Sequence, residues 1–314
     1  MTYEEFKALT TQLRADLGQV IKGQDRALDL LLIAVLSRGH ILLEGPPGTA
    51  KTLLARTFAQ RVQLGFKRVQ FTPDLMPGDV LGANIFDFDK RAFTLTKGPI
   101  FTDILLGDEI NRAPPKTQAA LLQAMQERQA TIDGTDHDLG EFFTVIATQN
   151  PIEQQGTYPL PEAQLDRFLF KVVLDFVDAK AEHEILMDAL GLEQGMTAGP
   201  VPIEANALSA GRALVEQIRL EPAIATYIVQ LVRATRSHSD FEAGASTRAA
   251  VALGQAAKAA AALEGRDYVI PDDVKALAVP TLTHRVVLSP TAEIEGRDSV
   301  TLIEGLVAQV EIPR

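Results

Sequence analysis

The chain has 314 residues, a formal net charge of −11, 46% hydrophobic and 23% charged residues, and no cysteine. This size and composition are typical of a globular protein with two domains, or with one large domain and an appendage. The absence of cysteine excludes disulfides and cysteine-ligated zinc, and the acidic balance disfavours general nucleic-acid binding, which needs clustered lysine and arginine.

The first ten residues, MTYEEFKALT, are acidic and polar. They lack the basic start and the apolar run of a secretory signal peptide. The longest apolar run, Leu30–Leu36, is far shorter than the ~20 residues that span a bilayer. We therefore expect a cytoplasmic protein without membrane insertion.

Strands and helices alternate up to about residue 190. Apolar residues recur with the helical period in Asp25–Arg38, in Lys51–Val62 and in 114–129, and two prolines begin the last of these segments. Short apolar runs predict strands within 40–45, 67–71, 98–109, 141–151 and 168–176. Because each run looks apolar on both faces, we expect an α/β fold whose parallel sheet is covered by helices on both sides.

The pattern changes after the glycine- and proline-rich segment 190–202, which has the composition of a linker. Helical periodicity then continues without strands, and the third of these helices is rich in alanine. We expect a first domain at 1–192 and a smaller all-α domain at 193–314. The expected helices of the second domain are Leu208–Leu220, Pro222–Arg236, Thr247–Leu263 and Pro271–Thr283.

The segment GPPGTAKT, residues 45–52, is typical of a phosphate-binding loop. Gly45 and Gly48 permit a tight loop whose backbone N–H groups point inward, and a helix begins directly after it. Lys51 would then reach the β- and γ-phosphates, and the hydroxyl of Thr52 would bind Mg²⁺. The strict pattern has glycine before the lysine, where this chain has Ala50. A working site, a decayed site and a simple strand-to-helix turn therefore remain open for this segment alone.

An apolar strand within 103–111 delivers Asp108 and Glu109 at its carboxyl end, where ligands bind in open α/β sheets. Asp108 could hold the Mg²⁺ shell through water, and Glu109 could orient and deprotonate a water for attack on the γ-phosphate. Acidic residues commonly cap strands without any function, but the phosphate loop upstream favours a functional pair.

Three further polar residues are weak signals when each is taken by itself. Asn150 follows a buried strand and could orient a water, although an asparagine before Pro151 is also a common turn residue. Arg167 precedes a strand and Arg248 begins a helix, positions at which an arginine is ordinarily solvated or caps a helix.

Taken together and in this order, the segments closely resemble the MoxR-type family of AAA+ ATPases. The resemblance extends from about Val20 to Val287, and the long run in 108–125 makes it more specific than a generic nucleotide signature. Alanine before the lysine is a variant that this family uses. The segments that carry the resemblance are LLEGPPGTAKT, DEINRAPPKTQAALLQAM, VIATQNPIEQQGTYPLPEAQLDRF and GASTRAAVAL.

The resemblance implies a three-layer αβα core with a parallel sheet, followed by a helical lid, and it implies ATP and Mg²⁺ as cofactors. Lys51 and Thr52 correspond to the Walker A pair, and Asp108 and Glu109 to Walker B. Asn150 corresponds to sensor 1, Arg167 to the arginine finger and Arg248 to the sensor 2 arginine. The implied nucleotide contacts are Gly23, in a segment that lies against the adenine, and Gly45, Pro46, Pro47, Gly48, Thr49, Ala50, Lys51, Thr52, Leu53 and Asp108; Thr52 and Asp108 are the implied metal residues.

Two further segments fall where this family carries insertions. Residues 71–98 correspond to a helix-2 insert and residues 128–144 to a β-hairpin before sensor 1, for which the Asp-Gly pair in TIDGT is a suitable turn. The resemblance implies a homo-hexameric ring in which both insertions contact a substrate. It also implies chaperone-like remodelling of a partner complex, often one with a von Willebrand A domain.

Three alternative functions remain open from the sequence. They are the ATPase subunit of a metal-chelatase-like complex, a nucleic-acid motor, which the acidic charge disfavours, and a nucleotide switch that does not turn over. Whether Arg248 acts in its own subunit or across to the next is also open, because residues 178–206 could hold a helix that repositions the lid. The histidines have no metal-ligand spacing, so we expect surface or packing roles for His40, His137, His183, His238 and His284.

Overall fold

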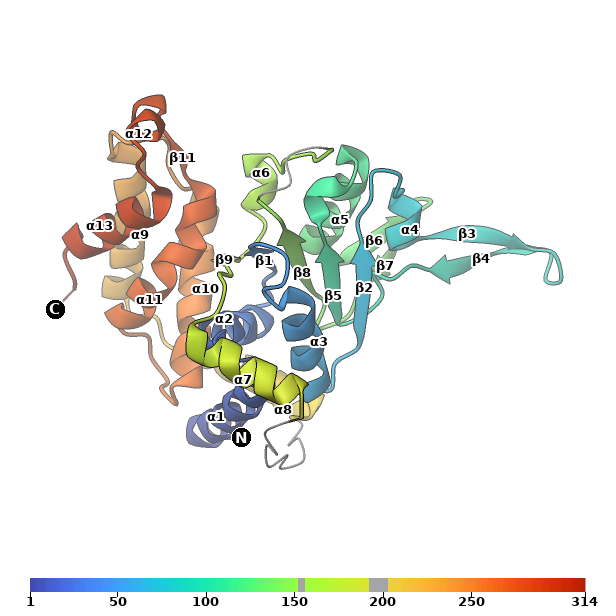
Figure 1. Ribbon diagram of the computed structural model, residues 1–314, viewed down its shortest axis with the longest axis horizontal. Coiled ribbons are helices and arrows are strands. Elements are labelled where there is room, and N and C mark those ends of the chain that lie inside the picture. Colours follow the sequence, from blue (N-terminus) through green and yellow to red (C-terminus); the bar gives the residue numbers. More distant parts are fainter. Residues whose placement is uncertain (152–155, 192–202, 314) are drawn as a thin grey trace.

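The computed structural model describes residues 1–151, 156–191 and 203–313 (Figure 1). A five-stranded parallel sheet in the order β2-β5-β8-β1-β9 forms its centre. These strands are β1 (Ile41–Glu44), β2 (Phe66–Gln70), β5 (Ile104–Asp108), β8 (Thr144–Gln149) and β9 (Phe170–Val173). Each lies within a run expected to be a strand, except that β2 begins one residue before its run, and the α/β fold with a parallel sheet is confirmed.

Alternate residues of the central strands face two separate hydrophobic clusters. Ile41 and Leu43 of β1 belong to one cluster and Leu42 to the other, and Ile104 and Leu105 of β5 divide in the same way. Successive side chains of a strand point to opposite faces, so the sheet is buried on both sides. The first face packs against α1 (Tyr3–Val20), α2 (Asp25–Leu36) and α3 (Lys51–Arg61), and the second against α5 (Pro115–Glu127) and the 3₁₀ turn η1 (Ile110–Arg112).

The expectation that every strand is apolar on both faces was wrong for β2. Lys67 and Arg68 are exposed, and Val69 is the buried residue of this strand. The reason is its position, because β2 forms the edge of the sheet and pairs only with β5. An edge strand has one uncovered side, where charged residues also oppose pairing with other chains.

Helix α1 was not predicted, although its start carries a recognisable signal. Thr2 accepts a hydrogen bond from the Glu5 N–H (3.2 Å), and Glu5 accepts one from the Thr2 N–H (2.7 Å). This reciprocal capping box satisfies two N–H groups that a helix start leaves without partners. Phe6, Leu13 and Leu17 then bury one face of α1 in the core.

The C-terminal part of the chain forms the helical lid. The predicted helices are confirmed within a few residues as α8 (Ala205–Gln217), α9 (Pro222–Ser237), α10 (Thr247–Leu263) and α11 (Pro271–Leu282). The expected linker and the expected domain boundary between 192 and 193 lie outside the described residues, so the boundary stays a prediction. The remaining elements of this part and of the segment before it are α6 (Glu162–Leu165), α7 (Ala179–Ala189), β10 (Phe241–Ala243), η2 (Thr283–Arg285), β11 (Val287–Leu288), α12 (Pro290–Ile294) and α13 (Ser299–Gln309).

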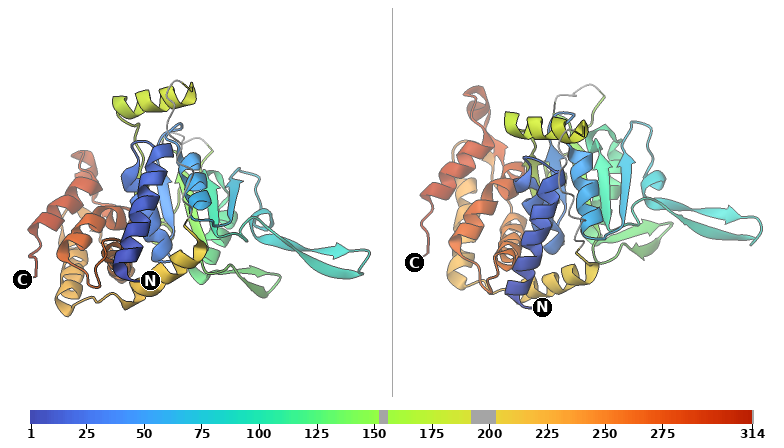
Figure 2. Two further views of the ribbon diagram at one scale, coloured as in Figure 1. Left: turned by 90° about the horizontal axis from the view of Figure 1, so that it is seen from below. Right: turned by 60° about the horizontal axis from the view of Figure 1, so that its bottom comes forward.

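Two antiparallel hairpins extend from the core on the side away from the lid (Figures 1 and 2). The longer one, β3 (Gly82–Asp87) and β4 (Ala92–Lys97), follows the short helix α4 (Pro77–Leu81) within the expected insertion at 71–98. The shorter one, β6 (Gln129–Ile132) and β7 (Thr135–Asp138), turns at Asp133 and Gly134, both with positive φ (49° and 78°). This geometry confirms the Asp-Gly hairpin turn expected from the sequence.

No helix among the described residues is long and apolar enough to cross a membrane. The same residues contain no group of three histidine, aspartate or glutamate side chains that could hold a metal ion.

His40 joins two layers of the core and confirms the packing role expected for it. Its Nδ1 accepts a hydrogen bond from the Val145 N–H (2.9 Å), and its Nε2 lies 3.0 Å from the carbonyl oxygen of Met125. Nδ1 must be unprotonated to accept, so the ring is the neutral tautomer with its proton on Nε2. Burial, assisted by the nearby charge of Arg128, lowers the pKa of His40 to about 3.

This low pKa predicts a pH-dependent stability. The unfolded chain binds a proton at His40 below about pH 6.5, and the folded chain does not until about pH 3. The free energy of unfolding should therefore fall as the pH falls, by about 2 kcal/mol between pH 7 and pH 5 from this residue. A glutamine can keep both hydrogen bonds without titrating, so the loss should be about 2 kcal/mol smaller in His40→Gln. Denaturant unfolding at the two pH values measures it, and equal losses in both proteins would contradict the prediction.

Candidate active site

A cavity of about 450 Å³ opens at the carboxyl edge of the sheet. The loop after β1, the ends of β5 and β8 and the start of α3 form its walls. Asp108, the last residue of β5, pairs with Gln70 of β2, and Gln149 of β8 pairs with Glu44 of β1, so these strand ends lie in one row. The lining residues are Pro47, Gly48, Thr49, Ala50, Lys51, Thr52, Leu53, Asp108, Glu109, Thr148, Gln149 and Asn150.

The backbone conformation of the loop before α3 explains why the loop contains glycines and how it accommodates an alanine. A Cβ on Gly45 would lie 2.3 Å from the carbonyl oxygen of Leu174, so no side chain fits there. Gly48 and Ala50 have positive φ (89° and 60°), and Ala50 lies in the left-handed region at the start of the helix. The strict pattern prefers glycine at this position because a residue with a Cβ pays roughly 1–2 kcal/mol for that conformation. Ala50 adopts it nevertheless, so the loop has the backbone of a phosphate cradle.

The side chain of Lys51 folds back onto the phosphate-binding loop that precedes α3. Its Nζ donates to the carbonyl oxygens of Gly45 (2.8 Å) and Pro46 (2.7 Å) and lies 3.3 Å from the hydroxyl of Thr49. Burial lowers the pKa of Lys51, while the charges of Asp108 and Glu109 oppose that shift. An ammonium group with several donors at the floor of an anion cradle could transfer to phosphate oxygens, which are stronger acceptors than carbonyl groups.

Asp108 has the surroundings of a carboxylate that binds a cation. Its Oδ2 lies 3.4 Å from the hydroxyl of Thr52 and accepts hydrogen bonds from Nε (3.0 Å) and Nη2 (2.7 Å) of Arg68. A hydroxyl and a carboxylate are hard oxygen ligands of the kind that Mg²⁺ takes together with phosphate oxygens. These two residues therefore fit the implied metal, and an incoming Mg²⁺ would compete with Arg68 for the same oxygen. Arg68 stands on the edge strand β2, outside any sequence motif, and was not among the predicted site residues.

Glu109 lies directly after β5 in a left-handed conformation (φ 57°, ψ 52°). Such a conformation is costly for a residue with a side chain, and strain of this kind clusters at functional sites. The Glu109 N–H donates to the hydroxyl of Thr148 (2.9 Å), and its carboxylate accepts from Nη1 of Arg112 (3.0 Å). The backbone of Glu109 is thus fixed, and its side chain stands at the cavity where it could orient a water.

Thr148 is a second site residue that was not predicted from the sequence. Its hydroxyl donates to Oδ1 of Asp108 (2.6 Å) and accepts from the Glu109 N–H, so one side chain holds both acidic residues. It is buried in β8, two residues before Asn150, which lines the same cavity. A lone threonine in an apolar strand carries no sequence signal, but a polar residue opposite an acidic strand end could have been noted.

Arg167 and Arg248 do not lie at this cavity. Arg167 stands just before β9 and borders a different cavity together with Arg248, near the amino edge of the sheet, where His40 directly precedes β1. Strands of four to six residues separate the two edges by roughly 15 Å at about 3.3 Å per residue. Gly23 also lies outside the cavity lining, and its Cα faces Val177 and Ala181 at the start of α7.

Comparisons with protein families match both halves of the chain. Residues 40–170 match the family described as "ATPase family associated with various cellular activities", and residues 233–306 match an AAA lid domain. A shorter match, over residues 16–63, is to magnesium chelatase subunit ChlI.

Individual proteins are similar over nearly the whole chain. The chaperone MoxR1 of Mycobacterium tuberculosis is 40% identical over 95% of this chain and 81% of its own length. The protein MoxR of Methylorubrum extorquens is 31% identical over 98% and 96%. The crystal structure of a putative ATPase from Cytophaga hutchinsonii has 40% identity, with a TM-score of 0.90 over 99% of this chain and 97% of that one.

The two hydrogen bonds of Thr148 predict its importance for turnover. Thr148→Val keeps the shape but removes the hydroxyl, so Asp108 and Glu109 lose their common partner. Hydrogen bonds to charged groups are worth about 1.5–3 kcal/mol, and we expect ATP hydrolysis to fall roughly tenfold or more while nucleotide affinity changes little. Initial rates of phosphate release and a fluorescent nucleotide titration measure the two quantities.

Thr144→Val is the matched control for this variant. Thr144 lies on the same strand, is equally buried, and its hydroxyl has no hydrogen-bond partner among the described residues. This control should keep the wild-type rate. If Thr148→Val also keeps it, the hydroxyl does not organise the acidic pair.

Proposed function

Because the chain belongs to the MoxR family of AAA ATPases, we propose that it uses Mg²⁺-dependent ATP hydrolysis, in a ring of identical subunits, to remodel or activate a partner protein. The observation that carries the proposal is the cavity at the carboxyl edge, where Lys51, Thr52, Asp108, Glu109 and Asn150 meet.

Each side chain at this cavity has a role that suits its position. Lys51 would bind the β- and γ-phosphates, and Thr52 and Asp108 would hold Mg²⁺, which would neutralise phosphate charge. Glu109 orients and deprotonates the attacking water, and Asn150 helps to place it. The strained backbone of Glu109 and its bond to Thr148 support this assignment, because a base must be held at a fixed place.

The arginines complete the site from a neighbouring subunit. Arg167 and Arg248 border a common cavity at the amino edge, about the length of the strands away from the cavity that Lys51 of the same chain lines. An arginine that stabilises charge on the transferring phosphoryl is worth about 10³–10⁵ in rate. If both arginines act on the neighbour's nucleotide, one subunit alone hydrolyses poorly, and activity requires the ring. We propose a hexamer on the basis of the family.

The hairpin β3–β4 supports a partner role. Phe88 and Phe93 expose 84% and 71% of their surface, and Phe86 packs edge to face against both. Exposed aromatic clusters of this kind are found where proteins bind partners. A relative is named as a chaperone, and a von Willebrand A domain protein is the partner class that the family suggests.

Two other functions are weaker candidates. The match to a magnesium chelatase subunit covers residues 16–63 only, which favours a shared phosphate loop over a shared substrate. A nucleic-acid motor would need a basic surface for the phosphate backbone, and the net charge of −11 opposes it.

The catalytic assignment predicts the behaviour of Glu109→Gln. The amide cannot accept a proton from water, but it leaves the phosphate loop intact. We expect the variant to bind ATP with near wild-type affinity and to hydrolyse it at less than about 1% of the wild-type rate. Equilibrium nucleotide binding and steady-state phosphate release with Mg²⁺ check this.

The exposed Glu162→Gln, which removes a carboxylate outside the cavity lining, should retain the wild-type rate. Added single- or double-stranded DNA should leave that rate unchanged. Absence of ATP binding by the wild type would refute the site, and strong stimulation by DNA would favour the nucleic-acid motor.

The hairpin predicts a separable partner effect. Replacing Phe88 and Phe93 by serine should leave basal ATP hydrolysis unchanged, because the hairpin lies apart from the cavity. It should abolish stimulation of the ATPase by a partner protein with a von Willebrand A domain. Ile294→Ser, at an equally exposed apolar residue of the lid (88% exposed), should keep the stimulation. Unchanged stimulation in the double variant would exclude the hairpin tip from the partner contact.

A further inference from the structure

We propose that Arg285, buried where the lid meets the core, is a positioning residue that fixes Arg167 and Arg248 as one unit for the neighbouring subunit's phosphates. The inference rests on the proposed function, in which both arginines act across the subunit interface. No motif in the sequence singles out Arg285, which stands in the turn η2 after α11.

The contacts of Arg285 surround the residue that carries the proposed arginine finger. Its side chain is 2% exposed, and its Nε donates to Oδ1 of Asp166 (2.7 Å). Its Nη2 donates to the carbonyl oxygens of Asp166 (3.2 Å) and Phe168 (2.6 Å), and its Nη1 to those of Leu169 (3.1 Å) and Thr281. The guanidinium therefore holds the backbone on both sides of Arg167 and ties it to the end of α11.

Asp166 extends this network to the second arginine. While Oδ1 binds Arg285, Oδ2 accepts a hydrogen bond from the hydroxyl of Ser246 (3.2 Å) and lies 3.7 Å from Nη1 of Arg248. Ser246 is the N-cap residue of α10, and Arg248 lies in its first turn. A single carboxylate thus links the loop that carries Arg167 to the helix that carries Arg248.

The cavity beside this network suits an anion. Its volume is about 210 Å³, and among the described residues that line it five are arginines and Asp166 is the one carboxylate. The chain as a whole has a net charge of −11, so this cavity differs in sign from the protein's overall charge. Asp166 and the carbonyl groups use the donors of Arg285, and Arg167 and Arg248 remain directed to the cavity. Phosphate groups are the anions that clustered guanidinium groups bind best.

An arginine is required for this network, and a lysine cannot replace it. The guanidinium has five N–H donors in a rigid plane, and all three of its nitrogens are used here. An ammonium has three donors on a flexible stem and would leave carbonyl groups of the Arg167 loop without partners. The loop would then lose its fixed place although the positive charge is kept.

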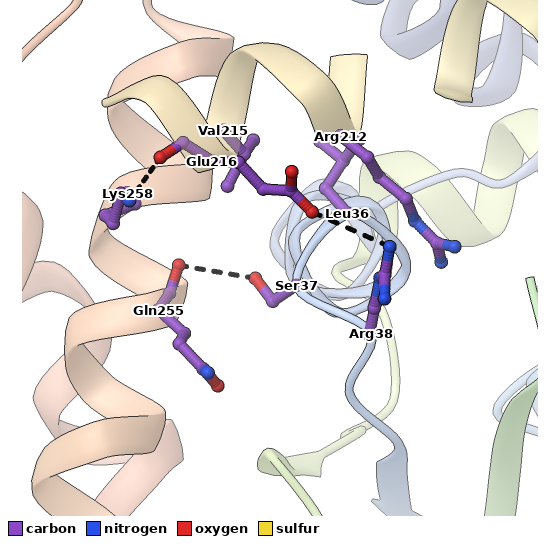
Figure 3. A pocket seen from close by; sticks show the side chains of 8 residues that line it. All are labelled: Leu36, Ser37, Arg38, Arg212, Val215, Glu216, Gln255 and Lys258. Carbon is purple, nitrogen blue, oxygen red and sulfur yellow. Dashed lines mark hydrogen bonds and ion pairs between the residues drawn. The ribbon is translucent and has the colours of Figure 1, made fainter. Parts of the chain in front are cut away.

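A second set of contacts joins the lid to the core without involving Arg285 (Figure 3). Near the end of α2, the Ser37 hydroxyl donates to the Gln255 carbonyl oxygen of α10 (3.5 Å), and Arg38 pairs with Glu216 of α8 (3.6 Å). Lys258 of α10 donates to the carbonyl oxygen of the same Glu216 (2.9 Å). Because these contacts anchor the middle of α10, a change at Arg285 should move the N-terminal end of α10 without releasing the lid.

The test uses subunit mixing with the full-length protein. Arg285→Lys by itself should bind ATP normally at its own phosphate loop and lose at least tenfold in ATP hydrolysis, the same loss that is expected of Arg167→Ala. Mixed with Glu109→Gln subunits, it should regain activity, because the mixed interface combines an intact phosphate site with an intact arginine pair. Mixed with Arg167→Ala subunits, it should regain none, because both lesions lie on the same side of the interface.

The controls separate this inference from the proposed function. Arg167→Ala mixed with Glu109→Gln tests the shared site alone, and failure of that pair to regain activity would refute the proposed function. Recovery in that pair without recovery for Arg285→Lys would overturn only the role of Arg285, and so would a wild-type rate in Arg285→Lys itself. If Arg285→Lys does not fold, as shown by loss of ATP binding, Asp166→Asn breaks the same network at a partly exposed group and should give the same mixing pattern.

Discussion

The candidate active site depends on the carboxylate of Asp108, which joins three elements of the core. One of its oxygens binds the hydroxyl of Thr148 on β8, and the other lies between Thr52 at the start of α3 and Arg68 on β2. These elements are distant in sequence, and the parallel sheet brings them together because its strands end in one row. A charged group that is only 8% exposed is stable when such partners surround it. The fold therefore determines the site, because the strand ends at the border of the core carry the polar side chains that surround Asp108.

Much of this arrangement could be predicted, because the decisive signals are local. The phosphate loop needs left-handed residues and a close backbone approach at fixed spacing, so GPPGTAKT reveals it, and Asp108 and Glu109 end a strand that is apolar throughout. Arg68 and Thr148 could not be predicted in the same way. Their importance comes from strand register. Val69 pairs with Gly107 and Ile146 with Leu106, and this alignment brings the neighbouring Arg68 and Thr148 to Asp108 at the end of β5. Register is a property of the assembled sheet. Helix α1 is a different case, since the capping residues Thr2 and Glu5 were visible in the sequence.

The two proposed halves of the catalytic site lie at opposite edges of one sheet. Lys51 and Asp108 stand at the carboxyl edge, and Arg167 and Arg248 stand at the amino edge. The rigid five-stranded sheet keeps Arg167, which lies just before β9, away from the phosphate site of its own chain, and the Asp166 carboxylate holds Arg248 of α10 at the same edge. The sequence left open whether Arg248 acts in its own subunit, and its ion-pair distance to Asp166 favours action across the interface. The arginine-rich cavity also gives an acidic protein one surface on which a neighbour's phosphates would find favourable charge.

The placement of the phosphate loop and the two arginines at opposite edges of the sheet would couple nucleotide binding between subunits of the proposed ring. The lid of each subunit contacts its own core through Asp166 and Arg285 and, in the ring, the neighbour's nucleotide through Arg248. ATP bound at one subunit would therefore contact both the core and the lid of the next subunit. If this contact stabilises one conformation of the next subunit, that conformation raises the ATP affinity of the first subunit by the same factor. A buried guanidinium with several fixed acceptors suits such a junction, because it changes between discrete arrangements rather than yielding gradually. Coupling between subunits would then follow from the position of two arginines beside the amino edge of the sheet, one in the segment before β9 and one in α10.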